Sequence, residues 1–402
     1  FKELTIEAAG RVSDYNLGNT GTVYAYNAGL IWAPVSDLKF RASYQRSVRA
    51  PTLGDLFSAP TQTFNNSFSD PCSQSNINNN TNRKKNCQDA GVPTTQTFTV
   101  GGVTTTEPFT NRPASGVGAA NQGNSGLKAE RGTSFTLGAV FQPRFLPGFS
   151  LSVDYYNIEI KDAIFTLTPQ TVLDQCYDNP SGINNPFCAS VTRLPNGTLA
   201  GQRNVFHAGS TVTLDNPGFS SLGKPFNYAR QKTSGIDFDI NYRHEFGSDV
   251  EFSTRGIVSY LINRDNYTDI TQTNFINRQK SELGDPEWRF QVSSNIKVGK
   301  INFGHKMQYI GKQILNTFEY ETFFPLQGHN PLNPDATPFP YYPSKWYHDF
   351  RLEVEATEKY QFYFGVDNAF NSLPPFDLLG TEAGSLYDPT GRFFYAGAKV
   401  KF

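Results

Sequence analysis

The chain has 402 residues with a formal net charge of -1, so no strong electrostatic field points to nucleic acid or to a highly charged partner. It contains no continuous apolar run near the roughly 18 residues of a membrane-crossing helix, which excludes a helical membrane span. A mean hydropathy of -0.46 does not exclude a membrane β-barrel, because strands that alternate apolar and polar residues keep the average low.

Strand-like runs with a two-residue period follow one another along the chain. In Ile236–Arg243, for example, every second residue is apolar or aromatic and the residues between are polar or charged. The runs are about ten to fourteen residues long, which exceeds the globular mean of five to six and suits a tilted transmembrane strand. The twelve predicted strands are 1–15, 21–33, 37–49, 131–142, 148–160, 230–245, 250–264, 286–297, 300–312, 344–356, 359–369 and 391–402.

The connections between these strands alternate in length. The short ones are Pro34–Ser36, Pro143–Pro147, Phe246–Asp249, Val298–Gly299 and Thr357–Glu358, and the long ones are near 50–130, 161–229, 265–285, 313–343 and 370–390. Only the brief turn Asn16–Thr20 breaks the alternation. An up-and-down membrane barrel has this property, with short periplasmic turns and long extracellular loops. The pattern predicts an all-β, antiparallel, up-and-down transmembrane barrel whose long loops all lie at one end.

The final strand, Gly391–Phe402, has one apolar face and one mixed face. The loop count predicts that Gly391 lies on the outer side, that Phe402 lies at the periplasmic rim, and that 359–369 is one partner strand. Aromatic residues reach 14% of the chain, which fits aromatic girdles but also sugar-binding surfaces or aromatic-rich solenoids. No signal peptide is visible at Phe1, so we expect the true N-terminus to lie upstream.

Four cysteines fall in two close pairs within long loops. Local pairing of Cys72 with Cys87 and of Cys176 with Cys188 is favoured among three possible connectivities, since it closes two short loops. Metal binding is the rival interpretation, but the CxxC spacing is absent. Two disulfides would place the loops in an oxidising compartment.

Several motifs in order resemble one family. The segments FRASYQRSVRAPTLGDLFS (40–58), GLKAERGTSFTLGAVFQP with LPGFSLSVDYYNIEIKDAI (126–164), NYARQKTSGIDFDINY (227–242), WYHDFRLEVEATEKYQFYFGVDNAFN (346–371) and YDPTGRFFYAGAKVKF (387–402) are similar to TonB-dependent outer-membrane receptors. This resemblance implies a 22-stranded barrel in a Gram-negative outer membrane, of which this sequence holds about 12 C-terminal strands. The plug domain, with its TonB box, would be absent from the sequence.

The resemblance also implies partners and a function. Outer-membrane lipid, a small-molecule ligand and, through the missing plug, the TonB complex would be the partners. The function would be TonB-energised uptake of a scarce ligand, either a ferric siderophore or a carbohydrate-type nutrient. No cofactor is expected. The charged residues that the alternation places on the lumen side are expected to form ion pairs along the wall; they are Asp237, Asp239, Arg243, Arg255, Arg289, Arg351, Glu353 and Glu355. In the family, such walls hold the plug.

Two other classes of protein remain open from the residues alone. A complete passive twelve-stranded porin or autotransporter-type barrel predicts that Thr5 and Ala398 lie on paired strands. A secreted soluble sugar-binding β-sandwich predicts that Ile236, Phe238 and Ile240 are buried in a protein core. An enzyme is not expected, because the sequence has no GxSxG, HExxH or P-loop pattern and its five His residues are scattered.

The best candidate for ligand binding is the aromatic, proline-rich loop 318–347, with a further candidate in the last loop. Rigid aromatic side chains at a barrel mouth stack on sugars or aromatic ligands. The alternative is an aromatic girdle, above all for Trp346 and Tyr347. Acidic residues in the cysteine loops lack calcium-loop spacing, so no metal site is predicted. The candidate ligand-binding residues are Tyr320, Phe323, Phe324, His329, Tyr341, Tyr342 and Tyr387.

Overall fold

The computed structural model describes residues 1–401 except 17, 66–68, 112–116, 202–203, 208–209, 214–219, 268–275, 315–340 and 376–385. One large antiparallel sheet, here called the wall, runs through most of it. The wall confirms all twelve predicted strands, and its order follows the chain apart from one added short strand, β15. Its strands are β1 (Glu3–Tyr15), β2 (Gly21–Val35), β3 (Leu38–Arg49), β8 (Glu130–Phe141), β9 (Phe149–Thr166), β13 (Pro225–Phe246), β14 (Val250–Tyr267), β15 (Asn277–Arg278), β16 (Trp288–Val298), β17 (Ile301–Ile310), β20 (Lys345–Glu355), β21 (Tyr360–Asp367) and β22 (Phe393–Val400).

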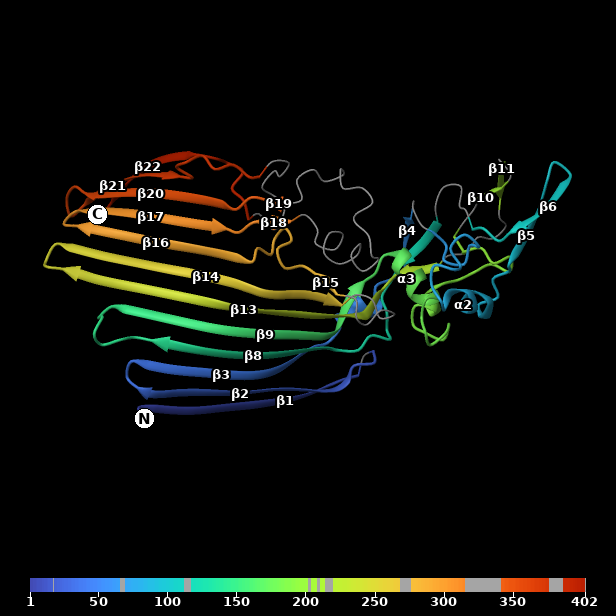
Figure 1. Cartoon of the computed structure of the whole chain (residues 1–402), viewed down its shortest axis with the longest axis horizontal. Coiled ribbons are helices and arrows are strands. Elements are labelled where there is room, and N and C mark those ends of the chain that lie inside the picture. Colours follow the sequence, from blue (N-terminus) through green and yellow to red (C-terminus); the bar gives the residue numbers. More distant parts are fainter. Residues whose placement is uncertain are drawn as a thin grey trace.

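The wall is open, with β1 at one edge and β22 at the other. Thr5 pairs with Ile31 of β2, and Ala398 pairs with Phe362 of β21. The two end strands are therefore not partners, and the prediction of a closed twelve-stranded barrel is wrong. The five predicted short turns and both chain ends lie at one end of the wall, and the long connections lie at the other, together with the brief turn between β1 and β2 (Figure 1).

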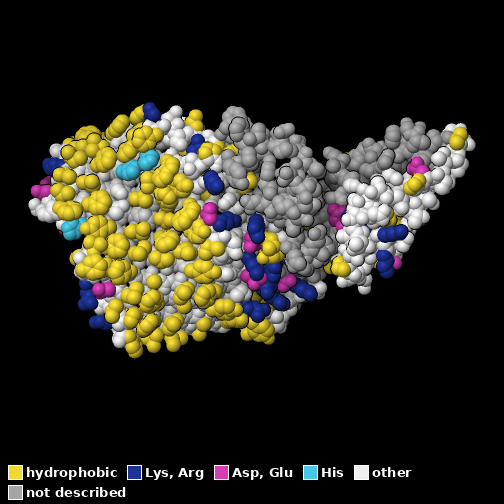
Figure 2. All heavy atoms as spheres, in the orientation of Figure 1, with side chains coloured by type: hydrophobic (Ala, Val, Ile, Leu, Met, Phe, Trp, Pro, Cys, Tyr) yellow, Lys and Arg dark blue, Asp and Glu magenta, His cyan; other side chains and the backbone are white. Residues whose placement is uncertain are grey.

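One face of the wall is apolar across all its strands, because the register places apolar residues opposite one another. Phe238 lies opposite Val153 and Val258, and Ile236 lies between Tyr155 and Tyr260. Figure 2 shows this apolar face as a broad band. Ile236, Phe238 and Ile240 are only half-buried, so the prediction of a soluble sandwich core is wrong.

The other face of the wall is polar and carries ion pairs within one strand, between neighbouring strands and between strands that have one strand between them. This confirms the predicted wall ion pairs for six of the charged residues. The pairs join Glu3 with Lys39, Arg41 with Asp154, Asp239 with Arg255, Arg243 with Glu251, Lys306 with Asp349, Arg351 with Glu353 and Lys297 with Glu355.

Two strands are longer than predicted. β9 reaches Thr166 and β13 begins at Pro225, which makes β13 a strand of 22 residues. Their extensions leave the wall and enter a compact body formed by the two longest loops (Figure 1). β22 is shorter than predicted, pairs with β21 as predicted, and ends on the short-turn side; Phe402 lies outside the described residues.

The compact body, here called the cap, consists of the described residues of 50–129 and 167–224 with the start of β13. Its hydrophobic core contains residues of both loops, including Phe109, Leu173 and Leu199, together with Phe226 and Tyr228 of β13. Over the described part of the chain, every helix is too short or too polar to cross a membrane. The cap elements are α1 (Leu53–Phe57), β4 (Thr61–Asn65), α2 (Arg83–Asp89), β5 (Thr95–Val100), β6 (Val103–Pro108), β7 (Val117–Asn121), α3 (Pro169–Tyr177), η1 (Cys188–Ser190), β10 (Asn204–His207), β11 (Ser210–Thr213) and β12 (Ser220–Gly223).

Candidate ligand-binding end of the sheet

The cap is joined to the wall where β3, β8 and β9 end. Arg49 makes two hydrogen bonds to the carboxylate of Glu130, Nε to Oε2 at 2.5 Å and Nη2 to Oε1 at 2.6 Å. Oε1 of Glu130 also accepts the Ile164 N–H at 2.7 Å, so one carboxylate ties three strands together. A bidentate guanidinium–carboxylate pair fixes orientation as well as distance.

The chain leaves this joint through α1, a five-residue helix with a reciprocal cap between Thr52 and Asp55. Leu56 on α1 is buried, and Gly123 packs directly against its backbone. A Cβ at Gly123 would lie 2.5 Å from the Leu56 carbonyl carbon, so only glycine fits there. The first cap loop therefore leaves the wall in a fixed direction.

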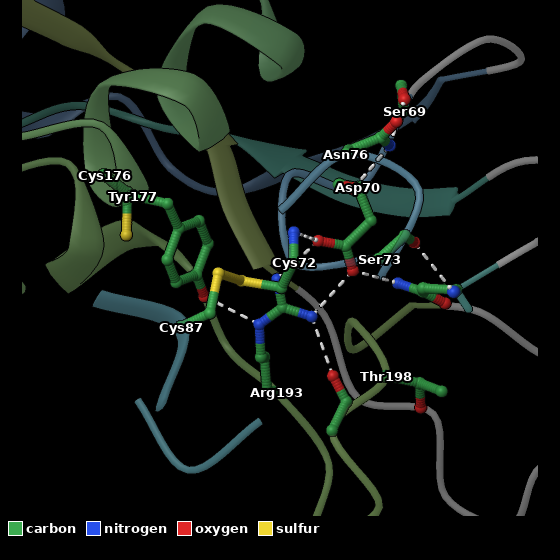
Figure 3. A network of polar contacts seen from close by, with 12 residues as sticks. Ser69, Asp70, Cys72, Ser73, Asn76, Cys87, Cys176, Tyr177, Arg193 and Thr198 are labelled. Carbon is green, nitrogen blue, oxygen red and sulfur yellow. Dashed lines mark hydrogen bonds and ion pairs between the residues drawn. A yellow bond between two sulfur atoms is a disulfide. The ribbon is translucent and has the colours of Figure 1, made fainter. Parts of the chain in front are cut away.

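A buried ion pair connects the two loops of the cap. Arg193 of the second loop donates from Nη2 to Oδ1 of Asp70 at 2.7 Å and from Nη1 to Oδ2 at 2.8 Å. Arg193 Nε donates to the Tyr177 hydroxyl at 2.6 Å, and the Asn111 amide donates to Asp70 Oδ2 at 2.6 Å. Figure 3 shows Arg193 at the centre of this network, beside the Cys72–Cys87 disulfide.

The network determines which charges persist inside the cap. Burial alone would raise the pKa of the Asp70 carboxyl, but the Arg193 charge and the hydrogen bonds it receives lower that pKa overall. Burial raises the pKa of the Tyr177 hydroxyl, although Arg193 opposes the shift. Asp70 is thus ionised and fully committed to partners within the cap.

A second set of contacts crosses between the loops nearby. Arg83 Nε donates to Asp178 Oδ1 at 2.6 Å, and the Asn86 amide donates to the Tyr177 and Asn179 carbonyls at 2.8 and 2.9 Å. β12 of the second loop pairs in parallel with β7 of the first, and β4 pairs with β7 on the other side. The two loops therefore form one folded unit.

Both predicted disulfides are present. Cys72–Cys87 and Cys176–Cys188 close loops separated by 15 and 12 residues, and all four cysteines belong to or pack against the cap core. Within the described ranges, no group of three or more His, Cys, Asp or Glu side chains is arranged to hold a metal ion. The two disulfides therefore serve to stabilise the fold of the cap.

A smaller cluster lies where the polar face meets the last loops. Tyr387 packs with Ile310 and Tyr347, and its hydroxyl accepts a hydrogen bond from the Gln313 amide. Burial raises the pKa of Tyr387 to about 12. β18 (Gln313–Ile314) pairs with β19 (Tyr341–Tyr342) beside this cluster, so the loop ends are anchored to the wall.

Comparison of the sequence with models of known protein families shows which family the chain belongs to. The model of the "TonB dependent receptor-like, beta-barrel" family matches residues 1–369. The chain belongs to the TonB-dependent receptor family. This confirms the resemblance of its motifs, and the family is one of outer-membrane receptors and transporters with β-barrels. Among curated proteins, no significant relative was found.

Solved TonB-dependent receptors share the fold of the wall. A mutant of the ferric enterobactin receptor of Pseudomonas aeruginosa, in complex with enterobactin, matches 100% of this chain at 13% identity with a TM-score of 0.56. The siderophore receptor PirA of Acinetobacter baumannii matches 100% of the chain at 13% identity with the same TM-score. The match covers 44% of each receptor, so this chain spans less than half of their length.

Most of the predicted ligand-binding residues fall outside the described part of this receptor: Tyr320, Phe323, Phe324 and His329. Tyr341 lies in β19 opposite Ile314. Tyr342 and Tyr387 are 8% and 2% exposed, so in this conformation they anchor loops and present little surface to a ligand. The prediction that these residues contact ligand stays a prediction.

The neighbouring residues Trp346 and Tyr347 differ in how they fit an aromatic girdle. Trp346 lies on the apolar face, 44% exposed, with its ring 4.6 Å from that of Tyr309. Tyr347 points to the opposite face, is buried, and accepts a hydrogen bond from the Asp388 N–H through its hydroxyl. The girdle interpretation is therefore wrong for Tyr347.

The sequence also gave no sign of a histidine pair on the apolar face of the receptor wall. His305 Nε2 and His348 Nδ1 are 3.0 Å apart on adjacent strands, with their rings nearly parallel. Period-two alternation puts His348 on the same face as Trp346, but its contact with His305 depends on the register of β17 against β20. The two ring nitrogens are each other's hydrogen-bond partners, so the pair can lie among apolar side chains.

Proposed function

We propose that this chain is part of the wall and loops of a Gram-negative outer-membrane receptor that takes up a scarce ligand with energy from TonB. The observation that carries the proposal is the division of the wall. Every strand presents apolar residues on one face and polar residues on the other, while all long loops gather at one end beside the cap. A barrel wall with an external mouth has this organisation.

The open edges of the wall need partners in a membrane, because unpaired backbone groups are costly in lipid. We infer that β1 and β22 pair with further strands of the same receptor. The coverage of 44% of the solved receptors supports this inference. The ion pairs of the polar face would then line the lumen and face the plug through which TonB acts.

A ferric siderophore is the favoured ligand. The solved structures of similar fold are described as ferric enterobactin and siderophore receptors. A carbohydrate was the rival because the cysteine loops are rich in Asn. However, Asn86 and Asn111 donate hydrogen bonds within the cap, and Asn185 donates to the Cys176 carbonyl at 3.1 Å. Much of the Asn content thus serves the fold of the cap.

The ligand would meet the receptor at the long-loop end of the polar face. There we propose contacts from the aromatic loop that contains Tyr320, Phe323, Phe324, His329 and Tyr341. Tyr342 and Tyr387 would join them once the β18–β19 ends open. Their hydroxyls and ring faces suit catecholate or other aromatic groups of an iron chelate.

The test is an uptake assay in a strain that lacks this receptor, complemented with the natural gene. We expect accumulation of radioactive iron from one ferric siderophore, abolished when TonB is deleted. A set of oligosaccharides under the same conditions is the control. Uptake of an oligosaccharide but no iron chelate would overturn the siderophore assignment, and uptake that persists without TonB would overturn the energised mechanism.

A further inference from the structure

Three of the long connections meet at one buried side chain at the long-loop end of the wall. Gln313 is the first residue of β18, which pairs with β19 at that end, and its side chain is 0% exposed (Figure 1). An amide side chain that is shielded from water needs partners for both its N–H and its C=O group. Both partners of Gln313 come from other connections of the chain.

The carbonyl end of this side chain holds the turn that precedes β16. Gly284 N–H donates to Gln313 Oε1 at 2.8 Å. Backbone contacts support this bond, because Ile314 N–H donates to the Ser281 carbonyl at 2.7 Å and Leu283 N–H donates to the Ile314 carbonyl at 3.0 Å. Gly284 has a φ of 106°, in the region that favours glycine. The turn is thus fixed to β18 by side-chain and backbone hydrogen bonds together.

The amide end of the same side chain holds the last connection. Gln313 Nε2 donates to the hydroxyl of Tyr387, which is 2% exposed and packs with Ile310 and Tyr347. The Tyr347 hydroxyl accepts the Asp388 N–H at 3.3 Å, so the neighbouring backbone is held as well. Gly284 and Tyr387 are 29 and 74 residues from Gln313 along the chain. One glutamine therefore joins the ends of three connections.

Burial makes these contacts depend on one another. A buried polar group that loses its partner carries a desolvation penalty, and the Gln313 amide cannot turn to water when the Tyr387 hydroxyl leaves. Either the amide stays unpaired, or the side chain leaves its site and the Gly284 N–H loses its acceptor. A displacement of Tyr387 is thus felt at β18 and at the turn before β16.

We propose that Gln313 is a positioning residue that couples the ends of these three connections, so that they open and close as one unit. A ligand that draws Tyr387 out of its cluster would release the Gly284 turn and the β18–β19 pair together. Tyr342 lies opposite Gln313 in that pair, so the same event frees its backbone. This consequence rests on the proposed contact of Tyr342 and Tyr387 with ligand, whereas the coupling rests only on the contacts within the receptor.

The test is hydrogen–deuterium exchange of the complete receptor in lipid nanodiscs without ligand, read at single amides by mass spectrometry. Tyr387→Phe removes only the hydroxyl, and we expect the Gly284 and Ile314 amides to exchange about fivefold faster, the equivalent of about one hydrogen bond. Both amides donate to other groups, so a purely local loss would not reach them. The matched control is Tyr347→Phe, which removes the hydroxyl that accepts the Asp388 N–H; Gly284 exchange should be unchanged there.

A second variant removes the coupling at its centre. Gln313→Met keeps a side chain of similar length and removes both hydrogen bonds, so we expect about 30-fold faster exchange of the Gly284 amide. In Gln313→Met/Tyr387→Phe the second change should add nothing, because the coupling is already lost. Should Tyr387→Phe fail to fold, Gln313→Met must also accelerate exchange of the Asp388 amide, which does not bond to Gln313.

Three results would overturn the proposal: unchanged Gly284 exchange in Tyr387→Phe, equal responses to Tyr387→Phe and Tyr347→Phe, or additive effects in the double variant. Unchanged Asp388 exchange in Gln313→Met would do the same. No ligand enters these measurements. The coupling can therefore fail while siderophore uptake succeeds, and uptake can fail while the coupling holds.

Discussion

The cap and the wall of this receptor are stabilised in different ways. The cap buries its apolar side chains, pairs its interior charges and carries both disulfides, as a small secreted domain does. The wall leaves large apolar side chains exposed; Ile6 at 74% and Phe394 at 59% are examples. Its strands are held by backbone ladders, and its apolar face is complete only against lipid. The cap is therefore built to be stable in water, and the wall is built to be stable against lipid.

The same residue type has opposite roles in the two regions. A buried charge in the cap is a structural contact, because Asp70 and Arg193 satisfy one another away from water. A charge at Phe238, which lies opposite Val153 and Val258 on the apolar face, would have no charged partner on the strands beside it. Substitutions should therefore affect the cap and the wall separately.

Loss of Arg193 should damage the cap most. Arg193→Ala leaves the Asp70 carboxylate buried without its counter-charge, and removing one member of such a pair costs about 3–5 kcal/mol. We expect rapid proteolysis of the cap under native conditions while the wall keeps its heat-resistant electrophoretic mobility. The natural receptor should resist the protease under identical conditions.

The matched control removes an arginine from the wall end. Arg144 pairs with Asp37 at 2.7 Å, but its side chain is 78% exposed, so Arg144→Ala should cost under about 1 kcal/mol. Equal protease sensitivity of the two variants would show that the cap network adds nothing beyond a surface ion pair.

The first disulfide should rank next. Cys72→Ser/Cys87→Ser opens a loop of 15 residues, for which chain entropy predicts a loss of about 3 kcal/mol. Urea titration of cap cleavage should show a lower midpoint for this variant, and dithiothreitol, which reduces both disulfides, should lower the midpoint of the natural receptor at least as far. A midpoint unmoved by either treatment would mean that the buried ion pairs alone hold the cap.

The wall is tested by arginine on each of its faces. Phe238→Arg places a charge on the lipid side of β13 and should cost about 2–4 kcal/mol if it lies near the bilayer centre. Asn241→Arg, on the polar face of the same strand, should be tolerated within about 0.5 kcal/mol. Folding into lipid vesicles, followed by urea titration, measures both. Equal losses for the two variants would contradict the assignment of faces.

Acid should give the smallest effect, absent at neutral pH. Because the folded pKa of Asp70 lies below its unfolded value of about 3.9, the associated stabilisation is complete above that pH and is lost as pH falls further. The urea midpoint of cap cleavage, with an acid-stable protease, should therefore drop below about pH 4. The double variant Asp70→Leu/Arg193→Met removes both charges, so its urea midpoint should change little with pH below about pH 4. If the midpoint of that variant still falls as in the natural receptor, other carboxyl groups cause the loss.

The sequence predicted the wall well because its information is local. Alternation of period two runs through most of each strand, although the pairing of β13 with β14 shifts at Ser234 and Gly235, and the lengths of turns and loops set the direction of the strands. The errors lie at β9 and β13, which extend beyond their predicted ends into the cap. Phe226 and Tyr228 continue the alternation there, but they pack into the cap, and no local pattern distinguishes that partner from solvent.

The cap could not be predicted from the sequence because its contacts join residues that are far apart in the chain. Asp70 and Arg193 are 123 residues apart, and Asn86 reaches Tyr177 across 91 residues. The available signal was weak: arginines and aspartates of opposite sign within two cysteine-bearing, Asn-rich loops. At the mouth, the aromatic rings of Tyr342 and Tyr387 predict ligand contact, but both side chains are buried beside the β18–β19 pairing, which residue spacing does not encode.

Because the two cap loops form one folded unit, recombination within the gene should be constrained. A gene crossover within the codons for β8 or β9 would combine the first loop of one parent with the second loop of another. Such a chimera would inherit Asp70 without a matched Arg193, and Asn86 without its carbonyl partners. Crossovers beyond β13 would keep the cap whole. Lineages of this receptor should therefore exchange residues 50–229 as a single block, and the strands that follow should diverge independently of it.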